Sequence, residues 1–173
     1  MASVDLRTIQ APLKERYRQD PAAARTQLHA EGSFADVGVT CTVTGWAGPV
    51  RAGLHPATGG DGSDACSGDM LLEALVACAG VTLRSVATAM RLSLSSVRVS
   101  ATSAFDARGT LGLSREVPVG ISDIELTADV ETDADDAALD KLAVLTERYC
   151  VVGQSLAKPP HLLIRRISAA EPS

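Results

Sequence analysis

Aromatic residues are scarce in this sequence: they occupy 3% of its 173 positions, with one tryptophan, two tyrosines and two phenylalanines. The hydrophobic fraction is nevertheless 46%, which is enough for a substantial core. That core must therefore be built from aliphatic side chains and alanine. The length is close to that of one typical domain.

Positive charge is also in short supply, since 16 lysines and arginines face 21 aspartates and glutamates, and the net charge is −5. This balance argues against nucleic acid or an anionic membrane as the partner. The uncharged apolar run from Ala74 to Leu83 covers only about half of the ~20 residues that span a bilayer. Residues 1–20 carry charges throughout and lack the apolar centre of a signal peptide, which favours a cytoplasmic location.

Metal-binding and phosphate-binding patterns are missing as well. Four widely spaced cysteines form neither a C-x-x-C motif nor a Cys/His pair at zinc spacing: Cys41, Cys66, Cys78 and Cys150. The glycine-rich segment 59–62 is not followed by the lysine of a phosphate loop. We therefore expect no metal site and no bound cofactor. In a reducing cytoplasm, paired cysteines are more often catalytic or redox-sensing than structural.

The segment from Asp69 to Arg91 has the pattern of one long helix, with Asp69 or Ser67 available to cap its start. Its middle is apolar all round, which predicts a helix buried on every side at the centre of the fold. Cys78 lies in that middle.

A helical wheel places Leu75 and Thr82 near Cys78, and Glu73 and Arg84 on the opposite side. No charge on the same helix therefore reaches this thiol, and its mid-helix position also denies it the dipole of a helix N-terminus. On these residues alone, Cys78 is a small apolar side chain packed in a core.

A second helix is predicted from about Ala134 to Val152, and its start, from Thr132 to Asp135, matches a capping box. One stripe of this helix is mostly apolar and should face the core; it comprises Leu139, Leu142, Ala143, Thr146, Tyr149, Cys150 and Gly153. This arrangement turns Cys150 inward.

Alternating apolar residues predict strands over 37–44, 50–55, 96–105, 119–131 and 161–167. The first two should form a hairpin, the next two an antiparallel pair with a long connection, and the last an edge strand. A short amphipathic helix over 7–19 should end at Asp20-Pro21.

Two motifs together carry a family resemblance. L-L-E-A-L-V-A-C ends at Cys78 after a glycine-rich loop, and R-Y-C-V-V surrounds Cys150 on the later helix, ahead of a proline turn and a last strand. This combination resembles the OsmC/Ohr family of osmotically inducible and organic-hydroperoxide-resistance proteins. The resemblance covers residues 23–168, which leaves 1–22 as an N-terminal helical extension and 169–173 as a disordered tail.

The resemblance implies an α+β protein with an OsmC-like fold, in which antiparallel sheets pack around a long central helix in an intertwined homodimer. It implies a thiol-dependent peroxidase for organic hydroperoxides, in which Cys78 resembles the peroxidatic cysteine and Cys150 the resolving one. The Cys78 thiolate would become a sulfenic acid, Cys150 would condense with it into a disulfide, and an external dithiol would reduce the bond.

Active members of the family stabilise the thiolate with an arginine that a glutamate orients, and here the sequence departs from that pattern. Gly68 occupies the position that matches the glutamate, with Asp69 beside it, and Arg51 is the only basic residue apart from His55 between Gly32 and the central helix. We expect Arg51 and Asp69 as supporting residues.

Without such a pair, the Cys78 pKa would stay near the free value of ~8.5 or above it. The alternative is therefore an OsmC-like protein without efficient peroxidase activity, which binds an apolar ligand or senses redox state at the dimer interface. A third reading is a dimeric scaffold whose N-terminal helix docks a partner.

Overall fold

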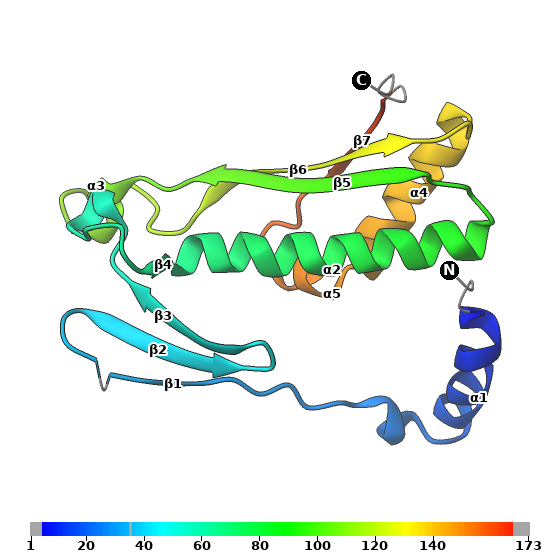
Figure 1. Ribbon diagram of the computed structural model, residues 1–173, viewed down its shortest axis with the longest axis horizontal. Helices are drawn as coiled ribbons and strands as arrows, with labels where there is room; N and C mark the ends of the chain where they lie inside the picture. The colour runs from blue at the N-terminus through cyan, green and yellow to red at the C-terminus, as the bar shows by residue number, and fades with distance from the viewer. Residues whose placement is uncertain (1–4, 35, 168–173) are drawn as a thin grey trace, which may run out of the picture.

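The computed structural model describes residues 5–34 and 36–167 and confirms the α+β class (Figure 1). The predicted tail at 169–173 lies outside these residues. The helices are α1 (Leu6–Gln19), α2 (Ser67–Met90), α3 (Ala107–Thr110), α4 (Asp136–Tyr149) and α5 (Val151–Ser155). The strands are β1 (Glu31–Ser33), β2 (Thr40–Gly45), β3 (Gly48–Gly53), β4 (Ala65–Cys66), β5 (Ser96–Ala104), β6 (Ser122–Glu131) and β7 (Leu162–Arg166). Two 3-10 turns occupy Pro21–Ala24 and Pro56–Thr58.

The C-terminal sheet has the order β5-β6-β7 and contains the predicted antiparallel pair. Every second residue of β6 is buried, namely Leu126, Ala128 and Val130, as the alternation in the sequence predicts. β7 is an edge strand, as expected, and it runs parallel to β6. The sheets are therefore not purely antiparallel, because β4 also runs parallel to β3 in the N-terminal sheet.

α2 is the core helix of the chain and packs against β5, α4 and α5. By length and composition alone it would also pass as a membrane span, but these contacts identify it as the core helix that the sequence predicts. Its buried residues join those of the sheet and α4 in one aliphatic cluster, which includes Leu75, Leu83, Val130 and Leu142.

Two details of the α2 prediction are wrong. The N-cap is Cys66, without a side-chain hydrogen bond, and neither Ser67 nor Asp69 caps the helix. The helix is not buried on every side of this single chain either, because the face carrying Ala74, Ala77 and Val81 is exposed, Val81 at 74%.

The second predicted helix is interrupted at Cys150, whose ψ of 102° is not helical. α4 ends at Tyr149, and the five-residue α5 begins directly after the break. The predicted cap is half right: the Asp135 carboxylate accepts a hydrogen bond from the Ala138 N–H at 2.8 Å, and this residue, not Thr132, is the N-cap.

The N-terminal sheet has the order β1-β2-β3-β4, and its β2–β3 hairpin turns at Gly45–Gly48, as the sequence predicts. β2 begins at Thr40, three residues later than predicted, and Val37 and Val39 precede it as exposed residues. In Figure 1 the hairpin stands apart from α2, and α1 lies beneath the C-terminal end of that helix. α1 ends before Asp20, as expected, and has no buried residue.

Candidate functional site

The structure brings Cys78 and Cys150 together. Cys78 comes from the middle of α2, and Cys150 comes from the break between α4 and α5. Both are free thiols, Cys78 packs against the core cluster that contains Cys150, and each thiol shifts the pKa of the other. Cys150 is 2% exposed, whereas Cys78 is only partly buried. A reagent from solvent therefore meets Cys78 first.

The break in the helix shapes this site. The Cys150 N–H still donates to the Thr146 carbonyl at 2.9 Å, which completes α4. The Cys150 sulfur then accepts from the Gly153 N–H at 3.4 Å and so caps α5. A side chain at Gly153 would meet this cap, since a Cβ there would lie 3.3 Å from the Cys150 sulfur. The glycine lets α5 fold closely back over the cysteine.

Hydrogen bonds from the break determine the acidity of Cys78. Partial burial raises its pKa, but donors converge on the sulfur: the Val152 N–H, the Cys150 thiol, the Val151 N–H and the Thr82 hydroxyl. Together they hold the pKa of Cys78 below its ordinary value. Each of these hydrogen bonds is stronger to the thiolate than to the neutral thiol, so each favours the ionised form of Cys78.

Cys150 shifts in the opposite direction. Burial raises the pKa of its thiol, and the hydrogen bond that it donates to Cys78 raises it further, because Cys150 must keep its proton to make that bond. The pair therefore loses its first proton from Cys78 and retains the second on Cys150. A thiolate beside a thiol is the arrangement needed for nucleophilic attack followed by disulfide formation.

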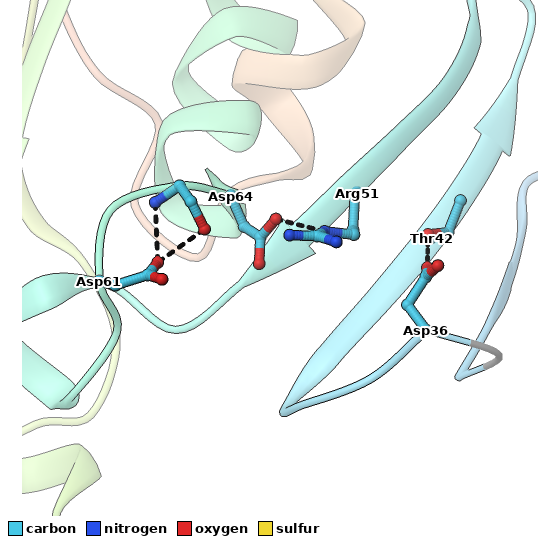
Figure 2. Close-up of polar contacts among 6 residues, drawn as sticks. Asp36, Thr42, Arg51, Asp61 and Asp64 are labelled. Atoms are coloured by element: carbon cyan, nitrogen blue, oxygen red, sulfur yellow. Dashed lines mark hydrogen bonds and ion pairs between the residues drawn. The ribbon is translucent and has the colours of Figure 1, made fainter.

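Arg51 and Asp69 lie elsewhere in this chain. Arg51, on β3, forms an ion pair with Asp64, and Figure 2 shows the guanidinium directed at that carboxylate. Its pKa is raised, chiefly by the Asp64 hydrogen bond. Asp69 is an exposed residue of the first turn of α2, roughly 13 Å along the helix axis from Cys78. Neither residue supplies one of the hydrogen bonds that set the Cys78 pKa.

Asp64 is the carboxylate that sequence reasoning missed. It precedes β4, whose parallel pairing with β3 brings it beside Arg51, and its side chain is only 13% exposed. Two more aspartates, Asp36 and Asp61, add to the negative field around Arg51 (Figure 2).

The N–H donors of Val151 and Val152 were missed as well, because in a continuous helix these N–H groups would bond to carbonyls of the preceding turn. Thr82 could have been found, since the wheel already places it near Cys78.

A wide groove is separate from the two thiols. It has a volume of about 760 Å³ and lies between β6 and the segment that leads to β7, and neither Cys78 nor Cys150 lines it. Among the described residues, no group of three or more His, Cys, Asp or Glu side chains is placed to hold a metal ion.

The chain has two sheets and a long helix, with two free thiols where that helix meets a broken second helix. These features define an α+β protein with a thiol-based site. The sequence model described as "OsmC-like protein" matches residues 60–164, which is more than half of the chain. The chain belongs to the OsmC-like family, which confirms the resemblance seen in its motifs.

Solved structures share this fold at low sequence identity. An OsmC-like protein from Mycoplasma pneumoniae is 11% identical with a TM-score of 0.66, and the alignment covers 84% of this chain and 99% of that one. An organic hydroperoxide resistance protein OsmC from Legionella pneumophila is 16% identical with a TM-score of 0.63, with coverages of 83% and 98%. One from Elizabethkingia anophelis is 13% identical with a TM-score of 0.64, with coverages of 83% and 97%. A comparison with curated proteins found no match.

Proposed function

We propose that this protein is a thiol-dependent peroxidase that reduces organic hydroperoxides, with Cys78 as the peroxidatic and Cys150 as the resolving cysteine. The observation that carries the proposal is the pair of free thiols packed in one core cluster, with the pKa of Cys78 lowered and the pKa of Cys150 raised. Family membership and the hydroperoxide-resistance proteins that share the fold support an oxidative-stress role.

In the first step, the Cys78 thiolate attacks the terminal oxygen of the hydroperoxide. The O–O bond breaks, its electron pair leaves with the alkoxide, and the alkoxide takes a proton to become an alcohol. The sulfur is oxidised to a sulfenic acid while the peroxide is reduced. The donors from Val151, Val152 and Thr82 keep Cys78 ionised for this attack.

In the second step, the Cys150 sulfur attacks the Cys78 sulfur. The S–O bond breaks as the S–S bond forms, the hydroxyl group takes one proton and leaves as water, and Cys150 gives up one proton, so the step balances. An external dithiol then attacks the disulfide, leaves with its own sulfurs oxidised, and returns both cysteines to the thiol state. The reducing cytoplasm would keep such a dithiol available, and all four cysteines are free, which fits that compartment.

An organic rather than a polar peroxide fits the surroundings of Cys78, which packs against the aliphatic core cluster. An apolar substituent on the peroxide would gain from leaving water near these side chains. Organic hydroperoxides also appear in the names of the proteins from Legionella pneumophila and Elizabethkingia anophelis.

We also propose that two copies intertwine as a homodimer. The apolar face of α2 at Ala74, Ala77 and Val81 is exposed in the single chain, and the N-terminal hairpin stands apart from it (Figure 1). A second copy would cover both, since exposed apolar patches favour association. Arg51 is the arginine that this hairpin could bring to the site of the other copy, with Asp64 in the orienting role expected of Asp69.

The test compares the wild type with Cys78→Ser and Cys150→Ser in assays with t-butyl hydroperoxide and a dithiol. We expect Cys78→Ser to abolish consumption of the dithiol and Cys150→Ser to accumulate sulfenic acid on Cys78. Equal rates for the wild type and Cys78→Ser would refute the proposal.

The second candidate function is an OsmC-like protein without efficient peroxidase activity, which binds an apolar ligand or senses redox state. It is favoured by the engagement of Arg51 with Asp64, away from the thiols of the same chain. Labelling of Cys78 with iodoacetamide against pH separates the two candidates. An apparent pKa below the free value of ~8.5 supports the peroxidase, and one at or above it supports the binding protein.

A further inference from the structure

A small cavity adjoins Cys150 on a side that Cys78 does not line. Its walls come from α2, α4, α5 and the proline turn before β7; they comprise Leu75, Ala79, Leu126, Thr146, Glu147, Cys150, Gly153, Gln154, Pro159, Pro160 and Leu162. The centre of a water molecule has about 10 Å³ to move in. That is about the space that one bound water needs.

Thr146 contributes a hydroxyl group to this wall. The residue is fully buried, at 0% exposure, and lies one helical turn before Cys150. Its Oγ1 has no hydrogen-bond partner among the described residues, although a threonine within a helix can bond to the carbonyl one turn earlier. An unpaired buried hydroxyl is costly, and a water in a polar cavity is the usual way to satisfy it.

The rest of the wall offers the further polar partners that a water needs. The Cys150 thiol lies on one side, and Glu147 and Gln154 also line the cavity. The Glu147 carboxylate accepts from the Leu162 N–H at 2.8 Å, lies 3.4 Å from His161 Nδ1 and remains partly exposed, at 24%. Glu147 therefore connects the cavity wall to solvent. With Thr146 it gives a buried water the two to four partners that are typical.

We propose that this cavity binds one water molecule between the Thr146 hydroxyl and the Cys150 thiol, and that Thr146 is a positioning residue for the resolving step. The inference rests on the proposed function, because it assigns a role within the peroxidase cycle. The bound water receives the thiol proton when Cys150 attacks, and Thr146 holds that water in place.

The protons and electrons of this step balance. The Cys150 S–H bond breaks, its proton passes to the bound water, and a proton passes on to the Glu147 carboxylate at the rim. The electron pair of the Cys150 sulfur forms the S–S bond with Cys78. The S–O bond of the sulfenic acid breaks, and the leaving hydroxide takes a proton from solvent at the exposed side of Cys78. One proton is released and one is consumed, so the products are the disulfide and water.

The test uses Thr146→Val, which keeps the shape and removes the hydroxyl, and Thr146→Ser, which keeps the hydroxyl. Each full-length protein is mixed with t-butyl hydroperoxide without a reductant. Dimedone trapping follows the sulfenic acid on Cys78, and mass spectrometry of quenched samples follows the disulfide. We expect equal rates of sulfenic acid formation in all three proteins. Disulfide formation should be about tenfold slower in Thr146→Val, on the scale of one hydrogen bond, and should be restored in Thr146→Ser.

A crystal structure of each protein gives a readout independent of activity. A water within hydrogen-bond distance of Thr146 Oγ1 and the Cys150 sulfur, lost in Thr146→Val, would support the inference. Disulfide formation at the wild-type rate in Thr146→Val, or equally slow in both variants, would overturn it while leaving the proposed function intact. A wild-type protein that forms no sulfenic acid would overturn the proposed function and this inference with it.

Discussion

The two halves of this chain differ in how they are packed. From Ser67 onward, α2, α4 and the C-terminal sheet share one aliphatic cluster, to which Cys150 belongs and against which Cys78 packs. Before Ser67, α1 and β1 have no buried residue, and Trp46 in the hairpin turn is fully exposed. The second half is thus organised as a core within one chain. The first half carries apolar side chains that one chain leaves uncovered, which is why we assign it to the contact between two copies.

The largest difference between the halves should appear in stability when a leucine is truncated in each. Leu142→Ala removes a fully buried side chain and should cost about 2–5 kcal/mol of unfolding free energy. Leu28→Ala changes a leucine that is 89% exposed in the single chain, and its cost should stay within about 0.5 kcal/mol when both variants are measured as dissociated monomers. Urea denaturation of both variants measures the contrast. Similar costs for the two leucines would show that the halves do not differ as described.

The exposed face of α2 offers the next test. Val81→Lys places a charge on the apolar face that we assign to the dimer, and it should weaken dimerisation by about tenfold to a hundredfold. Leu163→Lys is the matched control, since Leu163 is also exposed and lies on β7. Analytical ultracentrifugation over a dilution series gives both constants. A monomeric wild type, or an unchanged dimer in Val81→Lys, would contradict the assignment.

Two glycines of the packed half should respond differently to alanine. Gly80→Ala, where a new Cβ meets Val99 at an ordinary 3.8 Å, should stabilise α2 by about 0.5–1 kcal/mol. Gly153→Ala crowds the Cys150 sulfur and should instead cost about 1 kcal/mol and slow disulfide formation. Thermal unfolding and the rate of disulfide formation check the pair. A stabilised Gly153→Ala protein with normal kinetics would mean that the break at Cys150 tolerates a side chain.

The smallest effect is expected at the Arg51–Asp64 pair in the open half. Asp64→Asn should leave the thermal midpoint nearly unchanged, because Arg51 is half exposed and water screens the pair. The informative measurement is the Cys78 pKa in Arg51→Met. If the hairpin of one copy reaches the thiols of the other, this pKa rises with loss of the cation; an unchanged value would remove Arg51 from the site.

The sequence predicts the packed half well, because periodicity reports directly on burial. The alternation of β6 and the apolar length of α2 both follow from a single rule of which face meets the core. The two motifs also identify Cys78 and Cys150 without any coordinates. Nothing in the local pattern, by contrast, separates a helix that is covered by its own chain from one that a second copy would cover, so the open face at Val81 was not foreseen.

Contacts between distant segments are what the sequence does not reveal. The break at Cys150 depends on the Gly153 N–H binding the cysteine sulfur, and the capping pattern at Thr132 gives no sign of it. Asp64 reaches Arg51 only through the parallel pairing of β3 with a two-residue strand, which is too short to show alternation. The first feature lowers the Cys78 pKa, and the second fixes the position of Arg51, which we propose reaches the thiols of a second copy. The activating groups are therefore harder to predict than the sulfur atoms they act on.

The most direct measurement is the mass and peptide map of the wild-type protein after stoichiometric t-butyl hydroperoxide, quenched with an alkylating reagent. Our account predicts that the protein loses the mass of two hydrogen atoms and yields one cross-linked peptide joining Cys78 to Cys150, with Cys41 and Cys66 still alkylated. A protein in which both Cys78 and Cys150 remain alkylated, or in which Cys78 pairs with a different cysteine, would contradict it.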